Sequence, residues 1–388
     1  MMPTLRQRAF PVERFSWIQV YPTYRCNNHC TFCSQKPIRG VVADKLEVAT
    51  IKRVGAELEF FFKQRAGKSL IMDFLGGEMF DRLTPEHIDA YNSVVNNIIA
   101  FAKGHHVTVH LNILTNLLYP KENLYRFLEI FDRLKDAGVG DYSITSSFDL
   151  RGRFHTPEAL ARWRDNLAAV IPLVELPSIN FVLDKSFLKI LQERNTELSE
   201  IDAFEWLYSL ALDGKISLEH LRFYNVGDAD DDREMLTDKE YAQAVIWLIE
   251  NYPAAIPIEN NPILFAGDCC DGGHGSVTPT GGVQVNHCAN LTVMSCKSLS
   301  PEIPLDDALK ENSMCLRKVE DAYNSDYILQ SMVRYYGCLT CRHYQRCQLD
   351  CHKFWNIKKN HADPTSHYCW LREVNDYLVE KGLLDAAA

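Results

Sequence analysis

The sequence predicts an α/β protein in which a parallel sheet is followed by a cysteine-rich C-terminal region. Strand-like and helix-like segments alternate six times between residues 16 and 226, which is typical of parallel strands joined by helical crossovers. Three of the thirteen cysteines lie at 26–33 and the other ten between 269 and 369, with none between them. This asymmetry indicates two functional regions. Six strand–helix units suit either a doubly wound sheet or an incomplete barrel.

The first half of the alternation has the clearest periodicity. The segment "HVTVHLNILTN" alternates β-branched and polar residues as a strand does, and "KENLYRFLEIFDRLKDAG" is an amphipathic helix that Gly138 ends. We expect strands at 16–21, 69–77 and 106–116, and helices at 45–64, 85–102 and 121–138.

The second half repeats this pattern with a clear start signal. Thr156 is expected as the N-cap of a helix, and Pro157 is expected at its first position. We expect strands at 141–149, 177–184 and 216–226. We expect helices at 156–171 and 241–252, and a further helical stretch that follows the strand 177–184 and continues to about 213. Turn residues in "NNPILFAGDCCDGGHGS" mark the boundary to the second region.

The composition excludes several classes of protein. The chain has 388 residues, of which 46% are hydrophobic and 24% charged, and its formal net charge is −10. No basic stripe is present, so nucleic acid is not an expected partner. No apolar run of about 18 residues suggests a membrane span, and the first ten residues show no secretory signal. We therefore expect a cytoplasmic protein whose clustered cysteines bind metal rather than form disulfides.

The stretch "YRCNNHCTFC" places Cys26, Cys30 and Cys33 in a C-x3-C-x2-C loop directly after the first expected strand. Soft thiolates at short spacing favour zinc or iron–sulfur. Zinc would favour paired C-x2-C units, whereas this loop suits three corners of a [4Fe–4S] cube whose fourth iron is free. A structural zinc site completed from a distance is the alternative.

This loop, with Phe32 before the last cysteine, resembles the motif of radical S-adenosylmethionine (SAM) enzymes. The resemblance implies a partial (β/α)6 barrel in which SAM chelates the fourth iron. "LGGEMF" and "LTN" resemble the family's Gly-Gly-Glu and Thr-Asn segments, and the first of these meets the methionyl amino group. The segment "SSFDLRGR" would contact the SAM ribose or amino acid. Arg153, or less readily Arg151, would pair with the SAM carboxylate. The letters "SSFD" depart from the commoner Ser-Leu/Ile-Asp-Gly pattern of the family. The other cofactor-binding residues implied are Gly76, Gly77, Glu78, Thr115, Asn116, Ser146, Ser147 and Asp149.

The late stretch "CLTCRHYQRCQLDC" resembles the SPASM extension, which binds auxiliary [4Fe–4S] clusters; in isolation it would suggest a zinc ribbon. The resemblance implies one distal cluster and one proximal cluster. The distal ligands would be Cys338, Cys341, Cys347 and Cys369, and the proximal ligands Cys351, Cys288 and Cys270. The spacing after Gly282 is one residue longer than the family pattern, and Cys269 or Cys270 can serve as the ligand.

The resemblance therefore implies an enzyme that cleaves SAM to a 5′-deoxyadenosyl radical, abstracts a hydrogen atom and oxidatively modifies a peptide or protein. The alternatives are a dehydrogenase of a small alcohol, such as a sugar or aminocyclitol, and a non-catalytic zinc scaffold. Flavodoxin or ferredoxin is the expected electron donor, and a separate leader-binding protein stays open as a partner.

The expected regions are an extension at 1–15, a radical SAM barrel at 16–230, a helical bridge at 231–264, a SPASM-type domain at 265–375 and a tail at 376–388.

Overall fold

The computed structural model describes residues 17–30, 33, 44–149, 152–193, 199–222, 235–256, 274–278, 282–285, 337, 340–343 and 368–384. The chain divides into two compact units. The first comprises Met1–Ser146, Phe154–Glu175 and Cys269–Asn324, and the second comprises Ser147–Arg153, Leu176–Asp268 and Ser325–Ala388.

The first unit contains a mainly parallel sheet. Its strands are β1 (Trp17–Val20), β2 (Ser69–Phe74), β3 (Thr108–Leu114), β4 (Gly140–Phe148, of which the last two residues are assigned to the second unit), β7 (His274–Thr278) and β8 (Gly282–Val285). Their order is β4-β3-β2-β1-β7-β8, and every neighbouring pair is parallel except β7 and β8, which are antiparallel. The carboxyl ends of β1, β2 and β3 therefore meet at one edge of the sheet.

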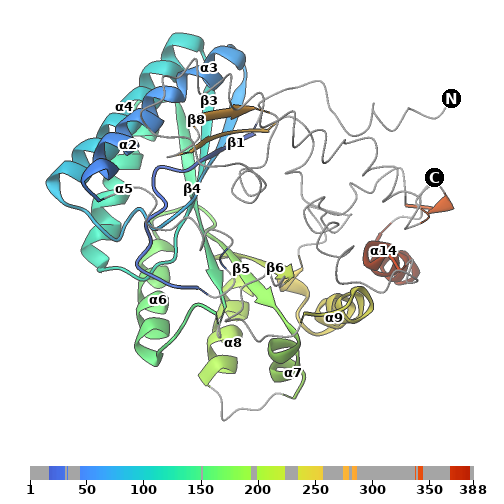
Figure 1. The fold of residues 1–388 in the computed structure, drawn as a ribbon. Coiled ribbons are helices and arrows are strands. Elements are labelled where there is room, and N and C mark those ends of the chain that lie inside the picture. Colours follow the sequence, from blue (N-terminus) through green and yellow to red (C-terminus); the bar gives the residue numbers. More distant parts are fainter. Residues whose placement is uncertain are drawn as a thin grey trace. The chain divides into compact units, whose positions relative to one another are not determined.

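Helices follow the strands as the alternation predicts. They are α2 (Asp44–Glu57), α3 (Glu59–Gln64), α4 (Pro85–His105), α5 (Lys121–Asp136) and α6 (Pro157–Val170), and Figure 1 shows α2, α4 and α5 along one side of the sheet. The Thr156 hydroxyl accepts from the N–H of Ala159, and Gly138 has a φ of 65° just after α5. Both expected helix signals are thus confirmed.

The two faces of this sheet differ in chemistry. The helix-facing positions are apolar and include the buried Leu70, Met72 and Phe74 of β2. On the other face, Asp73 pairs in register with Asn112 of β3, whose Nδ2 donates to the Asp73 carboxylate at 3.1 Å. The strands of this unit therefore bury an apolar core on one face and carry a polar network on the other.

The second unit is built around an aromatic core. The centroid of the Phe204 ring lies 5.2 Å from that of Phe181, 5.4 Å from that of Phe187 and 5.3 Å from that of Tyr252. Strands β5 and β6 pair in parallel, and α9 packs on α14 through Tyr241 and Trp370. The elements are β5 (Ser178–Leu183), α7 (Lys185–Glu193), α8 (Ser199–Leu212), β6 (Ser217–Arg222), α9 (Asp238–Asn251), the short 3-10 helix η2 (Pro253–Ala255) and α14 (Trp370–Glu380).

The α/β class and the parallel strands are confirmed, with local differences. The helix expected over 45–64 is two helices, because Phe61 donates its N–H to the Leu58 carbonyl three residues back and the hydrogen-bond pattern tightens there. The helical stretch expected up to about 213 is described as α7 and α8. Strands β7 and β8 were not expected; they come from the region assigned by sequence to the C-terminal domain and extend the first unit's sheet beside β1.

Candidate metal and cofactor site

The three-cysteine loop lies just after the carboxyl end of β1. Cys30 is buried, whereas Cys26 and Cys33 are partly exposed, and all three are free thiols. The N–H of Cys33 donates to the Cys30 carbonyl at 3.3 Å. Asn28 donates its backbone N–H to Cys26 Sγ at 3.5 Å and its side-chain amide to Cys30 Sγ at 3.3 Å. Phe32 lies outside the described residues.

This loop carries three thiols, which is the donor type that zinc and iron–sulfur clusters take. Within the described part of the chain, no group of three or more His, Cys, Asp or Glu side chains is gathered closely enough to hold a metal ion. Metal binding is coupled to the ordering of the metal's ligands, so thiolates come closer together when a cation binds. Three reduced thiols with N–H donors directed at sulfur fit a [4Fe–4S] cluster, since hydrogen bonds to sulfur are part of how proteins tune such clusters.

The Gly-Gly-Glu segment after β2 packs directly on this loop. The N–H of Gly77 donates to the Thr23 carbonyl at 2.9 Å, and the N–H of Glu78 donates to the Arg25 carbonyl at 2.6 Å. A Cβ on Gly77 would lie 1.6 Å from the Arg25 oxygen, and Gly76 has a φ of 125°. The two glycines are therefore required for close backbone approach to residues 23–25, which lead into Cys26.

Glu78 is the buried centre that joins this segment to the end of β3. Its carboxylate accepts from the N–H of Phe80 at 3.1 Å, from the Thr115 hydroxyl at 3.0 Å and from the N–H of Asn116 at 2.6 Å. The Thr115 hydroxyl also lies 3.0 Å from that of Tyr119, and burial and the Glu78 charge raise the pKa of Tyr119 well above its ordinary value. The structure thus brings the predicted Glu78, Thr115 and Asn116 together.

Asn116 connects this group to the first cysteine. Its Nδ2 lies 3.7 Å from Cys26 Sγ and donates to Asn27 Oδ1 at 2.7 Å. Its Oδ1 accepts from the N–H of Leu118 at 2.7 Å. The segments that follow β1, β2 and β3 therefore form one hydrogen-bonded group around the cysteine loop.

The fourth predicted segment divides between the two units. Ser146, in the first unit, is buried, and its hydroxyl accepts from Trp163 Nε1 at 3.1 Å. In the second unit, Asp149 and Arg153 are buried, and the N–H of Arg153 donates to the Asp149 carbonyl at 3.1 Å. Ser147, also in the second unit, is partly buried.

A buried polar group that no sequence motif indicates contacts the residues just before the cysteine loop. Glu47 of α2 accepts from the Thr23 hydroxyl at 2.6 Å, lies 3.2 Å from His87 Nε2 and pairs with Arg25 at 3.7 Å. His87 Nδ1 is in turn 2.9 Å from the Thr84 hydroxyl. These residues come from separate helices and loops, so no local pattern in the sequence indicates their contact.

The C-terminal cysteines are described only in part. Cys341 and Cys369 are partly exposed free thiols, and Cys369 immediately precedes α14. His343, two residues after Cys341, is buried and lies 2.7 Å from Asp376 of α14. The remaining predicted ligands lie outside the described residues: Cys270, Cys288, Cys338, Cys347 and Cys351.

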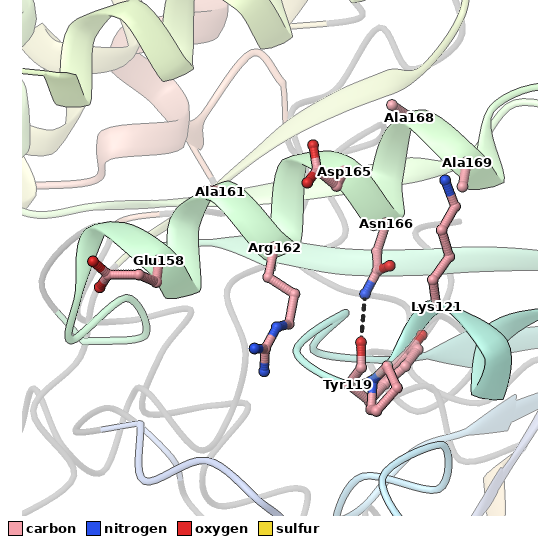
Figure 2. Close-up of a pocket in the computed structure, with 10 residues that line it drawn as sticks. Tyr119, Lys121, Glu158, Ala161, Arg162, Asp165, Asn166, Ala168 and Ala169 are labelled. Atoms are coloured by element: carbon pink, nitrogen blue, oxygen red, sulfur yellow. Dashed lines mark hydrogen bonds between the residues drawn. The ribbon is translucent and has the colours of Figure 1, made fainter.

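A pocket of about 600 Å³ lies between the start of α5 and α6, as Figure 2 shows. It carries two cations, Lys121 and Arg162, and two carboxylates, Glu158 and Asp165. Asn166 also lines it, and Figure 2 shows the Asn166 amide directed at the backbone of Tyr119. The pocket therefore reaches the loop that carries Asn116, although the three cysteines do not line it.

No protein-family model matches the chain, and no curated protein matches it. No helix among the described residues is both long enough and apolar enough to cross a bilayer.

Proposed function

We propose that this chain is a radical SAM enzyme with a SPASM-type C-terminal region that oxidatively modifies a peptide or protein. The observation that carries the proposal is the C-x3-C-x2-C loop at the carboxyl end of the first strand. The segments after the second and third strands, with Glu78 and Asn116, hydrogen-bond around it. Chemistry at the carboxyl ends of parallel strands is the rule in α/β folds.

In this proposal, Cys26, Cys30 and Cys33 would hold a [4Fe–4S] cluster. When bound, the cluster and SAM would supply the radical chemistry that takes a hydrogen atom from an unactivated C–H bond. The protein would bind and orient SAM and the substrate, and it would exclude water from them. The amides of Asn28 and Asn116 donate toward cysteine sulfur, and the Glu78 carboxylate orients the backbone of Asn116 by accepting from its N–H. The same carboxylate would accept from the SAM ammonium.

The C-terminal cysteines would hold two auxiliary clusters that accept the electron left on the product radical. Net oxidation of the substrate would then need no external oxidant. A cytoplasmic flavodoxin or ferredoxin would supply the electron for SAM cleavage. SPASM-type enzymes mostly act on ribosomal peptides or proteins, and the full set of late cysteines favours such a substrate over a small alcohol.

Iron and sulfide per chain after anaerobic reconstitution test the proposal. Wild type is compared with the Cys26→Ala/Cys30→Ala/Cys33→Ala triple variant. Three clusters predict about 12 irons falling to about 8, together with the loss of SAM cleavage, because each [4Fe–4S] cluster carries about four irons.

Two other outcomes point elsewhere. About 8 irons falling to about 4 would mean one auxiliary cluster and would favour the dehydrogenase of a small alcohol. Zinc in place of iron in both proteins would exclude the radical mechanism and favour the zinc scaffold.

A further inference from the structure

We propose that Asn166 of α6 is a positioning residue that holds the loop 115–119 so that Asn116 faces Cys26. Its effect on a cluster rests on the function proposed above. Asn166 belongs to none of the sequence motifs, and it lies 50 residues beyond Asn116 in the chain.

Asn166 is hydrogen-bonded to two backbone carbonyl groups of the loop 115–119. It is 2% exposed, and its Nδ2 donates to the Leu117 carbonyl at 2.9 Å and to the Tyr119 carbonyl at 2.9 Å. The carbonyl between them, that of Leu118, accepts from Asn27 Nδ2 at 2.8 Å. Two asparagines, one from α6 and one from the cysteine loop, thus bind three successive carbonyls. Figure 2 shows the Asn166–Tyr119 bond at the pocket wall.

The loop needs such support because its backbone is strained. Leu117 has a φ of 56°, in the left-handed region that a side chain with a Cβ disfavours. Leu117 donates its N–H to the Thr115 hydroxyl at 3.3 Å, and Leu118 donates its N–H to Asn116 Oδ1 at 2.7 Å. A strained residue persists only where its surroundings determine it fully. Glu78 holds the start of the loop through Thr115 and Asn116, and Asn166 supplies two further bonds from outside, at Leu117 and Tyr119.

Removal of Asn166 would leave two buried carbonyls without their amide donor. The loop would then relax around Leu117, and the bond from Asn116 toward Cys26 Sγ would be lost with it. An N–H directed at a cluster ligand sulfur stabilises the more negative, reduced cluster. Loss of that bond is therefore expected to make the midpoint potential of the cluster more negative.

The first test is amide hydrogen exchange of the full-length chain, metal-free and reconstituted, compared between wild type and Asn166→Ala. We expect exchange at Leu117 and Leu118 to rise by about tenfold or more, as follows when two buried hydrogen bonds are lost. Asn166→Ser, which keeps one donor, gives a smaller rise and serves as the milder variant if Asn166→Ala does not fold. Val170→Ala is the control, because Val170 is buried one turn further along α6 and has no hydrogen bond to the loop.

The second test follows the electron paramagnetic resonance signal that disappears in the Cys26/Cys30/Cys33 triple variant. Its midpoint potential should become more negative in Asn166→Ala and stay unchanged in Val170→Ala. Unchanged loop exchange, an equal rise in Val170→Ala, or an unchanged potential would each overturn the positioning role. If the wild type takes up no iron on reconstitution but the variants show the expected amide exchange, the proposed function is overturned. The role of Asn166 in positioning the loop 115–119 would still hold.

Discussion

Asp73, near the end of β2, is a carboxyl group whose protonation the fold controls. It is 7% exposed, and Trp17 Nε1 donates to it at 2.7 Å. Burial raises its pKa from 3.8 to about 6, while the hydrogen bonds from Trp17 and Asn112 and the nearby His110 partly oppose this rise. The native state therefore binds this proton more tightly than the unfolded chain does. The resulting stability is complete below about pH 4 and is lost as the pH rises through about 6.

We expect the difference in the free energy of unfolding between Asp73→Asn and wild type, both metal-free, to favour the variant more at pH 8 than at pH 5. The reason is that the wild-type carboxyl group loses its proton between these two pH values. The gain between these two pH values is about 1.4 kcal/mol, because the pKa of about 6 lies about one unit above pH 5 and each unit is worth about 1.4 kcal/mol. Denaturant unfolding of both proteins at the two pH values measures it. Asp89→Asn is the control, since Asp89 is exposed on α4. A difference between Asp73→Asn and wild type that does not change with pH would contradict the prediction.

Gly77 gives a second prediction at the scale of one residue. In Gly77→Ala, the new Cβ would meet the backbone of Arg25, which lacks room to move without breaking the bonds that hold residues 23–25. We expect a loss of about 2 kcal/mol or more in the free energy of unfolding, together with reduced iron uptake at the cysteine loop.

The matched control for this substitution is Gly104→Ala in α4. An added Cβ there meets nothing within 4 Å, so the change should stabilise the helix by up to about 1 kcal/mol. Normal iron uptake in Gly77→Ala would show that the close approach of the two backbones is not needed for the site.

At the scale of elements, α14 holds the segment that carries Cys341. Asp376 accepts from His343 Nε2 at 2.7 Å and from Arg342 Nε at 2.7 Å. Burial raises the pKa of Asp376, but the bonds from His343 and Arg342 outweigh it and hold the pKa below its ordinary value. The helix therefore binds this segment through a charged side chain rather than by apolar packing alone.

Asp376→Ala should release the segment around Cys341. We expect a loss of about 1 to 3 kcal/mol, because the hydrogen bonds involve charged groups and His343 is buried. Amide exchange at 340–343 and limited proteolysis measure the change. Glu380→Ala, at an exposed position one turn further along α14, should leave both unchanged. Equal exchange in the two variants would show that Asp376 does not hold this segment.

At the scale of the whole molecule, the alternation of apolar periodicity was enough to predict the order of strands and helices from β1 to α9. It also placed the cysteine loop, Gly-Gly-Glu and Thr-Asn directly after successive strands, because parallel strands bring their carboxyl ends to one edge. These features depend on neighbours within a few residues of one another in the chain. Local sequence determines them for that reason.

The tertiary structure alone decided which distant residues meet. Strand β7 lies beside β1 although more than 250 residues separate them, and Asn166, Glu47 and His87 contact the loops around the cysteines. Contacts of this kind depend on strand register and on helix packing, and no local pattern encodes either. The sequence by itself thus determined the α/β class and the candidate cysteine ligands. The side chains that hold the cysteine loop in place were decided by the packing of helices on the sheet.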